Sequence, residues 1–342
     1  MSSSKADNVP KLYEAFRGSF DIGAAVNPRT IIRAGDLIAK HYNSLTAENE
    51  MKFVSLHPAE DTYTFEGADQ IAAFAREHGK KMRGHTLVWH NQTTDWLFQE
   101  ADGSPVSRDK LFERLKSHID TVVKRYKEDI YAWDVVNEVI ADEGPDLLRP
   151  SKWLDIAGPG FIAKAFEYAH EADPKAQLFY NDYNESNPLK RDKIFNLVKS
   201  LLEQDVPVHG IGLQAHWNLY SPGLDEIRAA IEKYASLGLR LQLTELDVSV
   251  FRHDDLRTDL VRPTGVMLEQ QEKRYEELFN LLAEYRNHID AVTFWGAADD
   301  YTWLSDFPVR GRKNWPLLFD GSHEPKGSFW RVIKQTSQTS QT

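Results

Sequence analysis

Short apolar runs alternate with segments of helical spacing along most of this 342-residue chain. Eight apolar runs have the length of a buried strand. They span residues 20–26, 43–50, 81–89, 131–141, 177–183, 209–217, 240–248 and 291–297. Because strands covered on both faces are apolar almost throughout, these runs predict a parallel sheet.

Between the runs, apolar residues recur at the three- and four-residue intervals of a helix. These helical segments span residues 10–17, 31–42, 68–78, 107–126, 161–172, 189–204, 224–237, 271–285 and 328–335. In the segment 107–126, Leu111, Leu115 and Ile119 share one face, and Ser107 is expected to cap its start.

Eight strand–helix units over roughly 300 residues predict an α/β fold of the single (β/α)8 TIM-barrel type, with the active site at the C-terminal ends of the strands. We expect one catalytic domain over residues 1–342, with a core from about 18 to 333 and a disordered tail over 335–342. A doubly wound open sheet is the alternative, but no Gly-x-Gly-x-x-Gly turn follows the first strand.

Polar residues gather at the ends of the predicted strands, whereas the strand beginnings carry nothing comparable. They are Glu48, Asn49, His85, Trp89, Asn137, Glu138, Asn181, Tyr183, Gln214, His216, Glu245, Asp247 and Trp295. Any one of them has an ordinary structural explanation, but together they predict a site at one end of a barrel. We assign Trp133 and Trp153 to the core, and Asp142 and Asp182 to loops or caps.

Composition narrows the classes of partner. The net charge of −11 argues against a nucleic-acid partner, since such proteins carry a basic face. No apolar run approaches the roughly 20 residues that span a membrane, and the N-terminus lacks the apolar region of a signal peptide. With no cysteine, the chain has no disulfide and no thiolate site. We expect a cytoplasmic protein that is a monomer.

The residue types at the strand ends favour hydrolysis of a glycosidic bond, which uses two carboxylates. Four histidines could form a metal site, but none of them has the His-x-x-x-His spacing: His85, His90, His209 and His216. No Gly-x-Ser-x-Gly elbow supports a serine nucleophile. We therefore expect neither a metal nor another cofactor.

Five motifs stand out at the predicted strand ends: TAENEMK at 46–52, RGHTLVWH at 83–90, WDVVNE at 133–138, GLQAH at 212–216 and TELD at 244–247. Together they resemble the motifs of the glycoside hydrolase family 10 endo-β-1,4-xylanases, and the resemblance covers residues 18–333. The missing leader and the compact length resemble the intracellular bacterial branch of that family. The resemblance implies a retaining enzyme that cleaves internal β-1,4 bonds of xylan or xylo-oligosaccharides through a covalent glycosyl-enzyme intermediate.

The same resemblance implies roles for individual residues. Glu138 would be the acid/base and Glu245 the nucleophile, with His216 bridging Glu245 and Asp247. Asn137 would hold the sugar 2-hydroxyl at subsite −1, and Gln214 would contact the nucleophile or that sugar. The remaining substrate-binding assignments are Lys52, His85 and Trp295 at subsite −1 with Trp89 behind them, Glu48, Asn49 and Trp303 around subsite −2, and Tyr183 on the leaving-group side.

One departure from the family lies in the loop over residues 299–314. Many relatives carry an arginine soon after the loop tryptophan, whereas Trp303 is followed by Leu304 and Ser305. Arg310 and Arg312 are the candidates to replace it. Three other functions stay open: a β-1,4-glucanase that uses the same carboxylates, an inactive barrel that binds oligosaccharide, and a metal-dependent lyase or aldolase.

Overall fold

The computed structural model describes residues 9–339. Its centre is a closed parallel barrel, since the strand order β6-β5-β4-β3-β2-β1-β9-β8 is completed by pairing of β6 with β8. The strands are β1 (Asp21–Val26), β2 (Ser44–Ala47), β3 (Lys81–Trp89), β4 (Ile130–Asn137), β5 (Gln177–Asp182), β6 (Gly210–Leu213), β7 (His216–Asn218), β8 (Arg240–Ser249) and β9 (Ile289–Phe294). This closure confirms the predicted (β/α)8 barrel.

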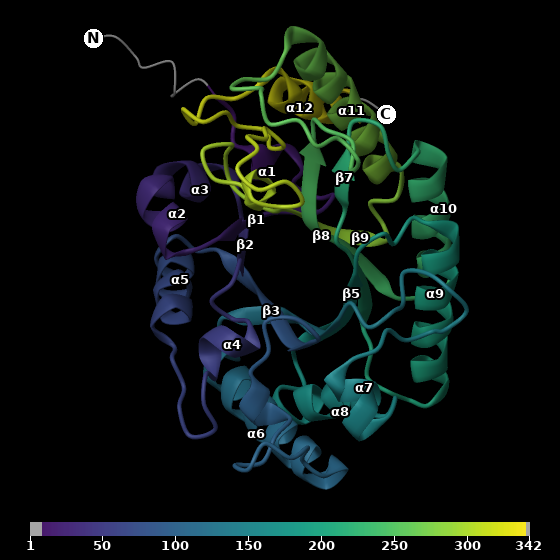
Figure 1. Ribbon diagram of the computed structural model, residues 1–342. Coiled ribbons are helices and arrows are strands. Elements are labelled where there is room, and N and C mark those ends of the chain that lie inside the picture. Colours follow the sequence, from purple (N-terminus) through teal and green to yellow (C-terminus); the bar gives the residue numbers. More distant parts are fainter. Residues whose placement is uncertain (1–8, 340–342) are drawn as a thin grey trace.

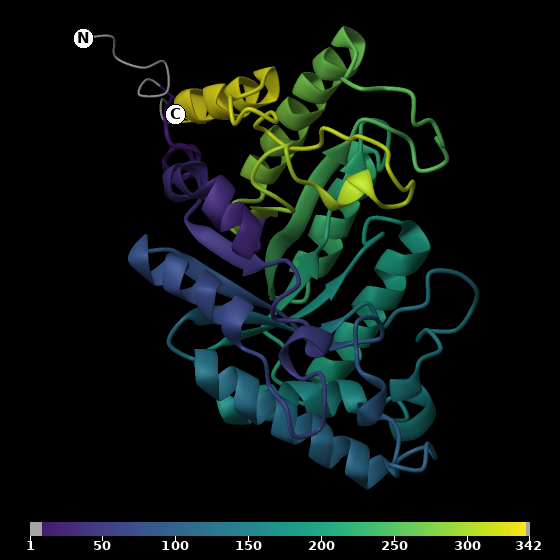
Figure 2. The ribbon, with the colours of Figure 1, turned by 60° about the vertical axis from the view of Figure 1, so that its left-hand side comes forward.

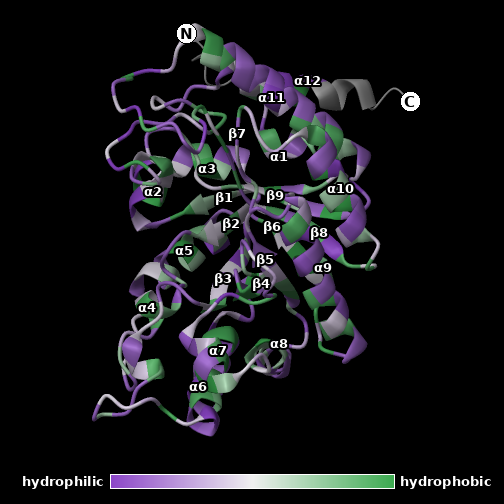
Figure 3. Cartoon of the chain, turned by 45° about the vertical axis from the view of Figure 1, so that its right-hand side comes forward, coloured by the Kyte–Doolittle hydropathy of each residue, from purple (hydrophilic) through white to green (hydrophobic). Residues whose placement is uncertain are grey.

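Helices surround the barrel (Figure 1). They are α1 (Leu12–Ala15), α2 (Pro28–Arg33), α3 (Gly35–His41), α4 (Phe53–Leu56), α5 (Glu66–Glu77), α6 (Arg108–Tyr126), α7 (Lys152–Ala157), α8 (Phe161–Ala172), α9 (Pro188–Glu203), α10 (Leu224–Ala235), α11 (Gly265–Glu284) and α12 (Gly327–Thr339), with 3-10 turns η2 (Asp95–Leu97) and η3 (Trp303–Ser305). Figure 3 shows hydrophobic and hydrophilic residues mixed along helices such as α6, α9 and α11, as expected for helices that bury one face. None of the helices in residues 9–339 is both long and apolar enough to cross a bilayer.

The predicted long helix forms as expected. Leu111, Leu115 and Ile119 of α6 are fully buried, and the Ser107 hydroxyl accepts a hydrogen bond from the Lys110 N–H at 3.2 Å. At the other end of the chain, disorder was expected from residue 335, but α12 continues through Thr339, and residues 340–342 lie outside the described part. Helix α12 also contacts α1, close to the start of the described chain (Figure 2).

Three local features differ from the predictions. The helix expected over residues 31–42 is two helices, because Asn27 caps an earlier start at Pro28 and the chain breaks at Ala34. The short helices α4 and α7 were not predicted, since neither is long enough to show periodicity. The sixth strand is divided into β6 and β7, because Ala215 has a φ of 60° and leaves the strand conformation.

Close packing inside the barrel explains why residue 84 is a glycine. A Cβ at Gly84 of β3 would lie 2.1 Å from Cε3 of Trp133 on β4, so the indole occupies the space of that missing side chain. Trp133 and Trp153 have exposed fractions of 0% and 1%, which confirms both as core residues.

A buried ion pair lies inside the barrel, between Arg83, the third residue of β3, and Asp134, the fifth residue of β4. The Arg83 guanidinium binds both carboxylate oxygens of Asp134, and its Nε donates to Gln242 Oε1 at 2.9 Å. This pair was not predicted from the sequence. The pairing depends on cross-strand register, which brings Arg83 of β3 beside residues of β4 and cannot be read from either segment alone.

Candidate active site

The predicted site residues converge on one cleft of about 610 Å³ at the C-terminal ends of the strands. Twelve of the fourteen line it: Glu48, Asn49, Lys52, His85, Trp89, Glu138, Tyr183, Gln214, His216, Glu245, Trp295 and Trp303. The other two, Asn137 and Asp247, are each 1% exposed and are bonded to cleft residues from behind.

Glu138 enters the cleft where β4 ends. Its φ is 59°, in the left-handed region that costs a non-glycine residue about 1–3 kcal/mol and is found mainly at functional sites. The Trp89 indole N–H donates to Oε2 of Glu138 at 2.7 Å, and the Gln214 amide donates to Oε1 at 2.8 Å. The backbone N–H of Glu138 donates to the Asn181 carbonyl at 2.9 Å, so the carboxylate is held on several sides.

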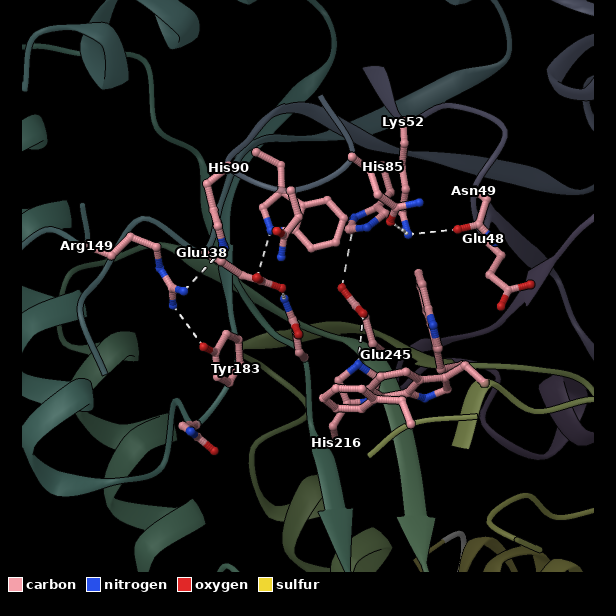
Figure 4. A pocket seen from close by; sticks show the side chains of 18 of the residues that line it. Glu48, Asn49, Lys52, His85, His90, Glu138, Arg149, Tyr183, His216 and Glu245 are labelled. Carbon is pink, nitrogen blue, oxygen red and sulfur yellow. Dashed lines mark hydrogen bonds and ion pairs between the residues drawn. The ribbon is translucent and has the colours of Figure 1, made fainter. Parts of the chain in front are cut away.

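Glu245 is the sixth of the ten residues of β8. Its Oε1 accepts a hydrogen bond from the Asn181 amide at 2.9 Å, and its Oε2 lies 3.0 Å from Nε2 of His216. Nδ1 of His85 lies 4.0 Å from Oε1. Glu245 and Glu138 face the same space (Figure 4), so the two carboxylates share one cleft.

The surroundings move the pKa values of the two carboxyl groups in opposite directions. Burial raises the pKa of Glu138, as do the charges of Asp182 and Glu245, and the Gln214 hydrogen bond does not reverse this. Burial would also raise the pKa of Glu245, but His85 and His216 outweigh it and lower that pKa. These shifts favour the protonated form of Glu138 and the ionised form of Glu245.

His216 lies between two acidic side chains. Its Nε2 faces Glu245, and its Nδ1 lies 2.9 Å from Oδ2 of Asp247. Burial opposes the imidazolium, but the charges and hydrogen bonds of the two carboxylates prevail and raise the pKa of His216 to about 10. The indole N–H of Trp303 donates to the same Oδ2 of Asp247 at 2.8 Å. This hydrogen bond connects the loop after β9 to the contacts among Glu245, His216 and Asp247.

The Asn137 side chain has a hydrogen-bond donor that no described residue uses. Its Oδ1 accepts hydrogen bonds from Asn181 at 2.9 Å and Gln214 at 3.2 Å, whereas its Nδ2 is buried and has no partner in the described part of the chain. A buried amide donor costs free energy unless a ligand binds it. Of the two contacts predicted for Gln214, the one with the nucleophile is not formed: Gln214 binds the predicted acid, whereas Asn181 binds the predicted nucleophile. The contact of Gln214 with the sugar stays a prediction.

One side of the carboxylate pair carries Lys52, Asn49 and Glu48 (Figure 4). The Lys52 ammonium donates to Asn49 Oδ1 at 3.0 Å and to Gln92 Oε1 at 2.9 Å, and it lies 5.0 Å from the Trp89 ring centroid. Burial lowers the pKa of Lys52, although the nearby glutamates act in the opposite direction. Hydrogen-bonding groups beside an indole face suit a sugar, which has both hydroxyls and an apolar face.

The opposite side carries Tyr183 and Arg149 (Figure 4). The Arg149 guanidinium donates to the Tyr183 hydroxyl at 2.9 Å, and that hydroxyl donates to Asp142 Oδ2 at 2.5 Å. Lys190 joins this network through Asp142 at 2.6 Å and Asp182 at 2.9 Å. Asp182 is thus a fully buried strand residue, and its assignment to a loop or cap was wrong.

A comparison with known proteins decides the family. The model described as glycosyl hydrolase family 10 matches residues 11–335. The chain belongs to glycosyl hydrolase family 10. Endo-1,4-beta-xylanase B of Paenibacillus barcinonensis is 60% identical over 327 residues, covering 96% of this chain and 98% of that protein. An endo-1,4-beta-xylanase of Geobacillus stearothermophilus is 59% identical over 328 residues, covering 95% of this chain and 98% of that protein.

Solved structures agree with this assignment. A crystal structure of xylanase XynB from Paenibacillus barcinonensis, complexed with a conduramine derivative, matches this family 10 chain with a TM-score of 0.94 at 60% identity. The match covers 95% of this chain and 98% of the crystallised one.

Several cleft residues of this family 10 chain were given no binding role from the sequence. They are His90, Asn91, Gln92, Arg149, Asn184, His253 and Phe307. All of them lie in loops that follow strand ends, where no periodicity marks the positions that face the cleft. For His90–Gln92, their place directly after the end of β3 was a signal that could have predicted a role in the site. Neither Arg310 nor Arg312 lines the cleft, and Arg312 instead donates to the Asp255 carbonyl.

Carboxylates, amides and aromatic rings line the cleft together with Lys52, Arg149 and histidines. Across the described residues, no group of three or more His, Cys, Asp or Glu side chains is arranged to hold a metal ion. The histidines nearest the carboxylates use their ring nitrogens on acidic partners: His85 on Asp134, and His216 on Glu245 and Asp247.

Proposed function

We propose that this family 10 protein is a retaining endo-1,4-β-xylanase. The observation that carries the proposal is the carboxylate pair, Glu138 at the end of β4 and Glu245 on β8, with pKa values shifted in opposite directions. Retaining glycosidases need one protonated and one ionised carboxyl group in one cleft.

In the first step, Glu245 attacks the anomeric carbon while Glu138 donates its proton to the leaving oxygen. The glycosidic bond breaks, and an ester joins the sugar to Glu245. Formation of that ester removes the negative charge that helped to raise the pKa of Glu138, so the ionised Glu138 can accept a proton from water. Water then attacks the anomeric carbon, the bond between that carbon and the Glu245 oxygen breaks, and Glu245 leaves as a carboxylate, which completes the second inversion.

The neighbouring side chains position the sugars. Asn137 would donate its spare Nδ2 to the 2-hydroxyl of the sugar that reacts. Lys52, Asn49 and Glu48 would bind the glycone side. Tyr183, held by Arg149 and Asp142, would contact the leaving-group side.

Selection of xylose over glucose would be steric. Lys52, Trp295 and Trp303 line the cleft, and they would crowd the hydroxymethyl group that glucose carries and xylose lacks. A steric clash can reject the larger sugar more strongly than the absence of a methylene group can reject a smaller one, since that absence changes the binding free energy by only about 1–3 kcal/mol. Comparable kcat/KM values on aryl xylobioside and aryl cellobioside would reject steric selection of xylose and favour the glucanase alternative.

Digestion of xylohexaose tests the function directly. An endo-xylanase cuts internal bonds, so xylobiose, xylotriose and xylotetraose are expected as the first products. Release of xylose alone from one end would contradict endo action, and an intact substrate would favour the inactive barrel. Activity that a chelator abolishes would support the metal-dependent alternative.

A further inference from the structure

A buried lysine lies behind the proposed leaving-group side of the cleft. Lys190 is the third residue of α9, where the Asn187 side chain caps the helix by accepting the backbone N–H groups of Leu189 and Lys190. Lys190 is 1% exposed, and it is not among the residues that line the cleft. A lysine is almost never buried to this degree unless its charge is paired, so its partners indicate what it does.

The Lys190 ammonium pairs with two carboxylates from different segments. Its Nζ lies 2.9 Å from Oδ1 of Asp182, a fully buried residue at the end of β5, and 2.6 Å from Oδ1 of Asp142, in the segment after β4. Burial would lower the pKa of Lys190, but the two carboxylates outweigh it and raise that pKa, so the ammonium stays charged. Without Lys190, the two carboxylates would lose the cation that they share.

Both carboxylates also hold Tyr183, and the ammonium lies over its ring. Oδ1 of Asp182 accepts the backbone N–H of Tyr183 at 2.9 Å, and the Tyr183 hydroxyl donates to Oδ2 of Asp142 at 2.5 Å. Nζ of Lys190 lies 3.6 Å from the centroid of the Tyr183 ring, which is within the range of a cation–π interaction. Lys190 and its two partners therefore fix the backbone, the hydroxyl and the ring of Tyr183 together.

Lys190 differs from Arg149, the other cation beside Tyr183. Arg149 lines the cleft and donates to the Tyr183 hydroxyl at 2.9 Å, so it can itself contact a substrate (Figure 4). Lys190 does not line the cleft, so it can affect a bound sugar only through the residues that it holds. Among Asp142, Asp182 and Tyr183, the residue that lines the cleft is Tyr183.

We propose that Lys190 is a positioning residue that holds the Tyr183 ring in place for the sugar on the leaving-group side. This inference rests on the proposed xylanase function. A ring that is already fixed loses little conformational freedom when a sugar binds, so more of the interaction free energy remains for binding. The effect of Lys190 should therefore pass through Tyr183 and be limited to substrates that have a sugar on that side.

A double-mutant cycle on xylohexaose tests this route. Lys190→Met keeps a long side chain but removes the ammonium, and we expect it to lower kcat/KM by about tenfold. In the Tyr183→Ala background, the same change should lower kcat/KM by about twofold or less, because the ring that Lys190 holds is gone. β-Xylobiosyl fluoride has no sugar on the leaving-group side, so Lys190→Met should change its kcat/KM, corrected for spontaneous hydrolysis, by about twofold or less.

Lys326→Met is the matched control. Lys326 has a side chain that is 9% exposed, and its Nζ lies 2.9 Å from Oδ2 of the buried Asp299, but neither residue lines the cleft. This variant should change kcat/KM on xylohexaose little. If Lys190→Met does not fold, Lys190→Gln, which keeps a hydrogen-bond donor but no charge, takes its place in the cycle with the same expectation.

Four results would each overturn the proposal. They are no loss from the Lys190 variant, a loss that is as large in the Tyr183→Ala background, an equal loss on the fluoride, and an equal loss from Lys326→Met. Failure of the wild type to cleave xylohexaose would instead reject the proposed function.

Discussion

Glu138 and Glu245 are the same kind of side chain, and their neighbours decide which one holds a proton. Within residues 9–339, the Glu138 carboxylate accepts hydrogen bonds from the neutral donors Trp89 and Gln214, and the Glu245 charge acts against its ionisation. Glu245 instead faces His85 and the imidazolium of His216. The roles follow from these neighbours, and three single-residue changes test them.

Glu138→Ala removes the proposed acid. We expect xylan hydrolysis to fall by about 10²–10⁴-fold, the usual contribution of general acid catalysis. An aryl xyloside with a good leaving group needs little protonation, so its bond cleavage should fall much less. Steady-state rates on the two substrates measure the difference, and equal losses would show that Glu138 is not the acid.

Glu245→Ala removes the proposed nucleophile, and near-complete loss of activity is expected on every substrate. Azide can occupy the space of the missing carboxylate and attack the anomeric carbon in one displacement. The glycosyl azide should therefore have inverted configuration, which NMR spectroscopy distinguishes. A retained azide product would place the nucleophile at another residue.

His216 should make stability depend on pH. Its pKa rises from about 6.5 in the unfolded chain to about 10 in the folded protein. The stabilisation is therefore complete below pH 6.5 and is lost as the pH rises through 10. At 1.36 kcal/mol per pKa unit, its upper limit is about 5 kcal/mol.

Urea denaturation at pH 6 and pH 10 measures this effect. The free energy of unfolding of the wild type should fall more than that of His216→Gln, because the variant has no imidazolium to lose. Identical losses in the two proteins would show that His216 is not charged in the folded state.

Sequence could predict the polar residues at strand ends, because a carboxylate or amide that closes an apolar run is conspicuous. It could not predict how these residues pair. Gln214 and Asn181 both end strands, and only the structure shows that Gln214 binds Glu138 whereas Asn181 binds Glu245. Arg149 was missed because a loop position carries no periodic signal.

At the scale of elements, the strands were predictable because their apolar runs are continuous. The interruption of the sixth strand was not, since Ala215 is an ordinary residue that adopts a φ of 60° only in its tertiary setting. This interruption has a functional consequence: Gln214 and His216 flank Ala215, and both line the cleft.

The contact between β3 and β4 makes a stability prediction. Gly84→Ala would place a methyl group 2.1 Å from a ring carbon of Trp133, so the sheet or the indole must move. We expect a loss of about 1–3 kcal/mol, typical of overpacking, measured as the free energy of unfolding in urea. Gly265→Ala at the start of α11 is the matched control, because nothing lies within 4 Å of its Cβ position. A Gly84 variant as stable as this control would contradict the packing argument.

At the scale of the whole molecule, polar groups lie in the barrel interior as well as in the cleft at the strand ends. The Arg83–Asp134 ion pair lies within the barrel, and Asp134 also binds Nδ1 of His85, which in turn faces Glu245. The buried Asp134 carboxylate thus helps to hold His85, which lines the cleft. The barrel itself was predictable from eight repeated units, but this interior support was not, because it depends on register between strands.

The central claim is that the two carboxylates act in a double displacement, and the anomer first released tests it most directly. Proton NMR spectra recorded during the first minutes of xylohexaose hydrolysis, before mutarotation, distinguish the two anomers of the new reducing end. Two inversions at the same carbon predict the β-anomer first, with the α-anomer appearing only as mutarotation proceeds. Initial release of the α-anomer would contradict the account, because it would mean a single displacement by water.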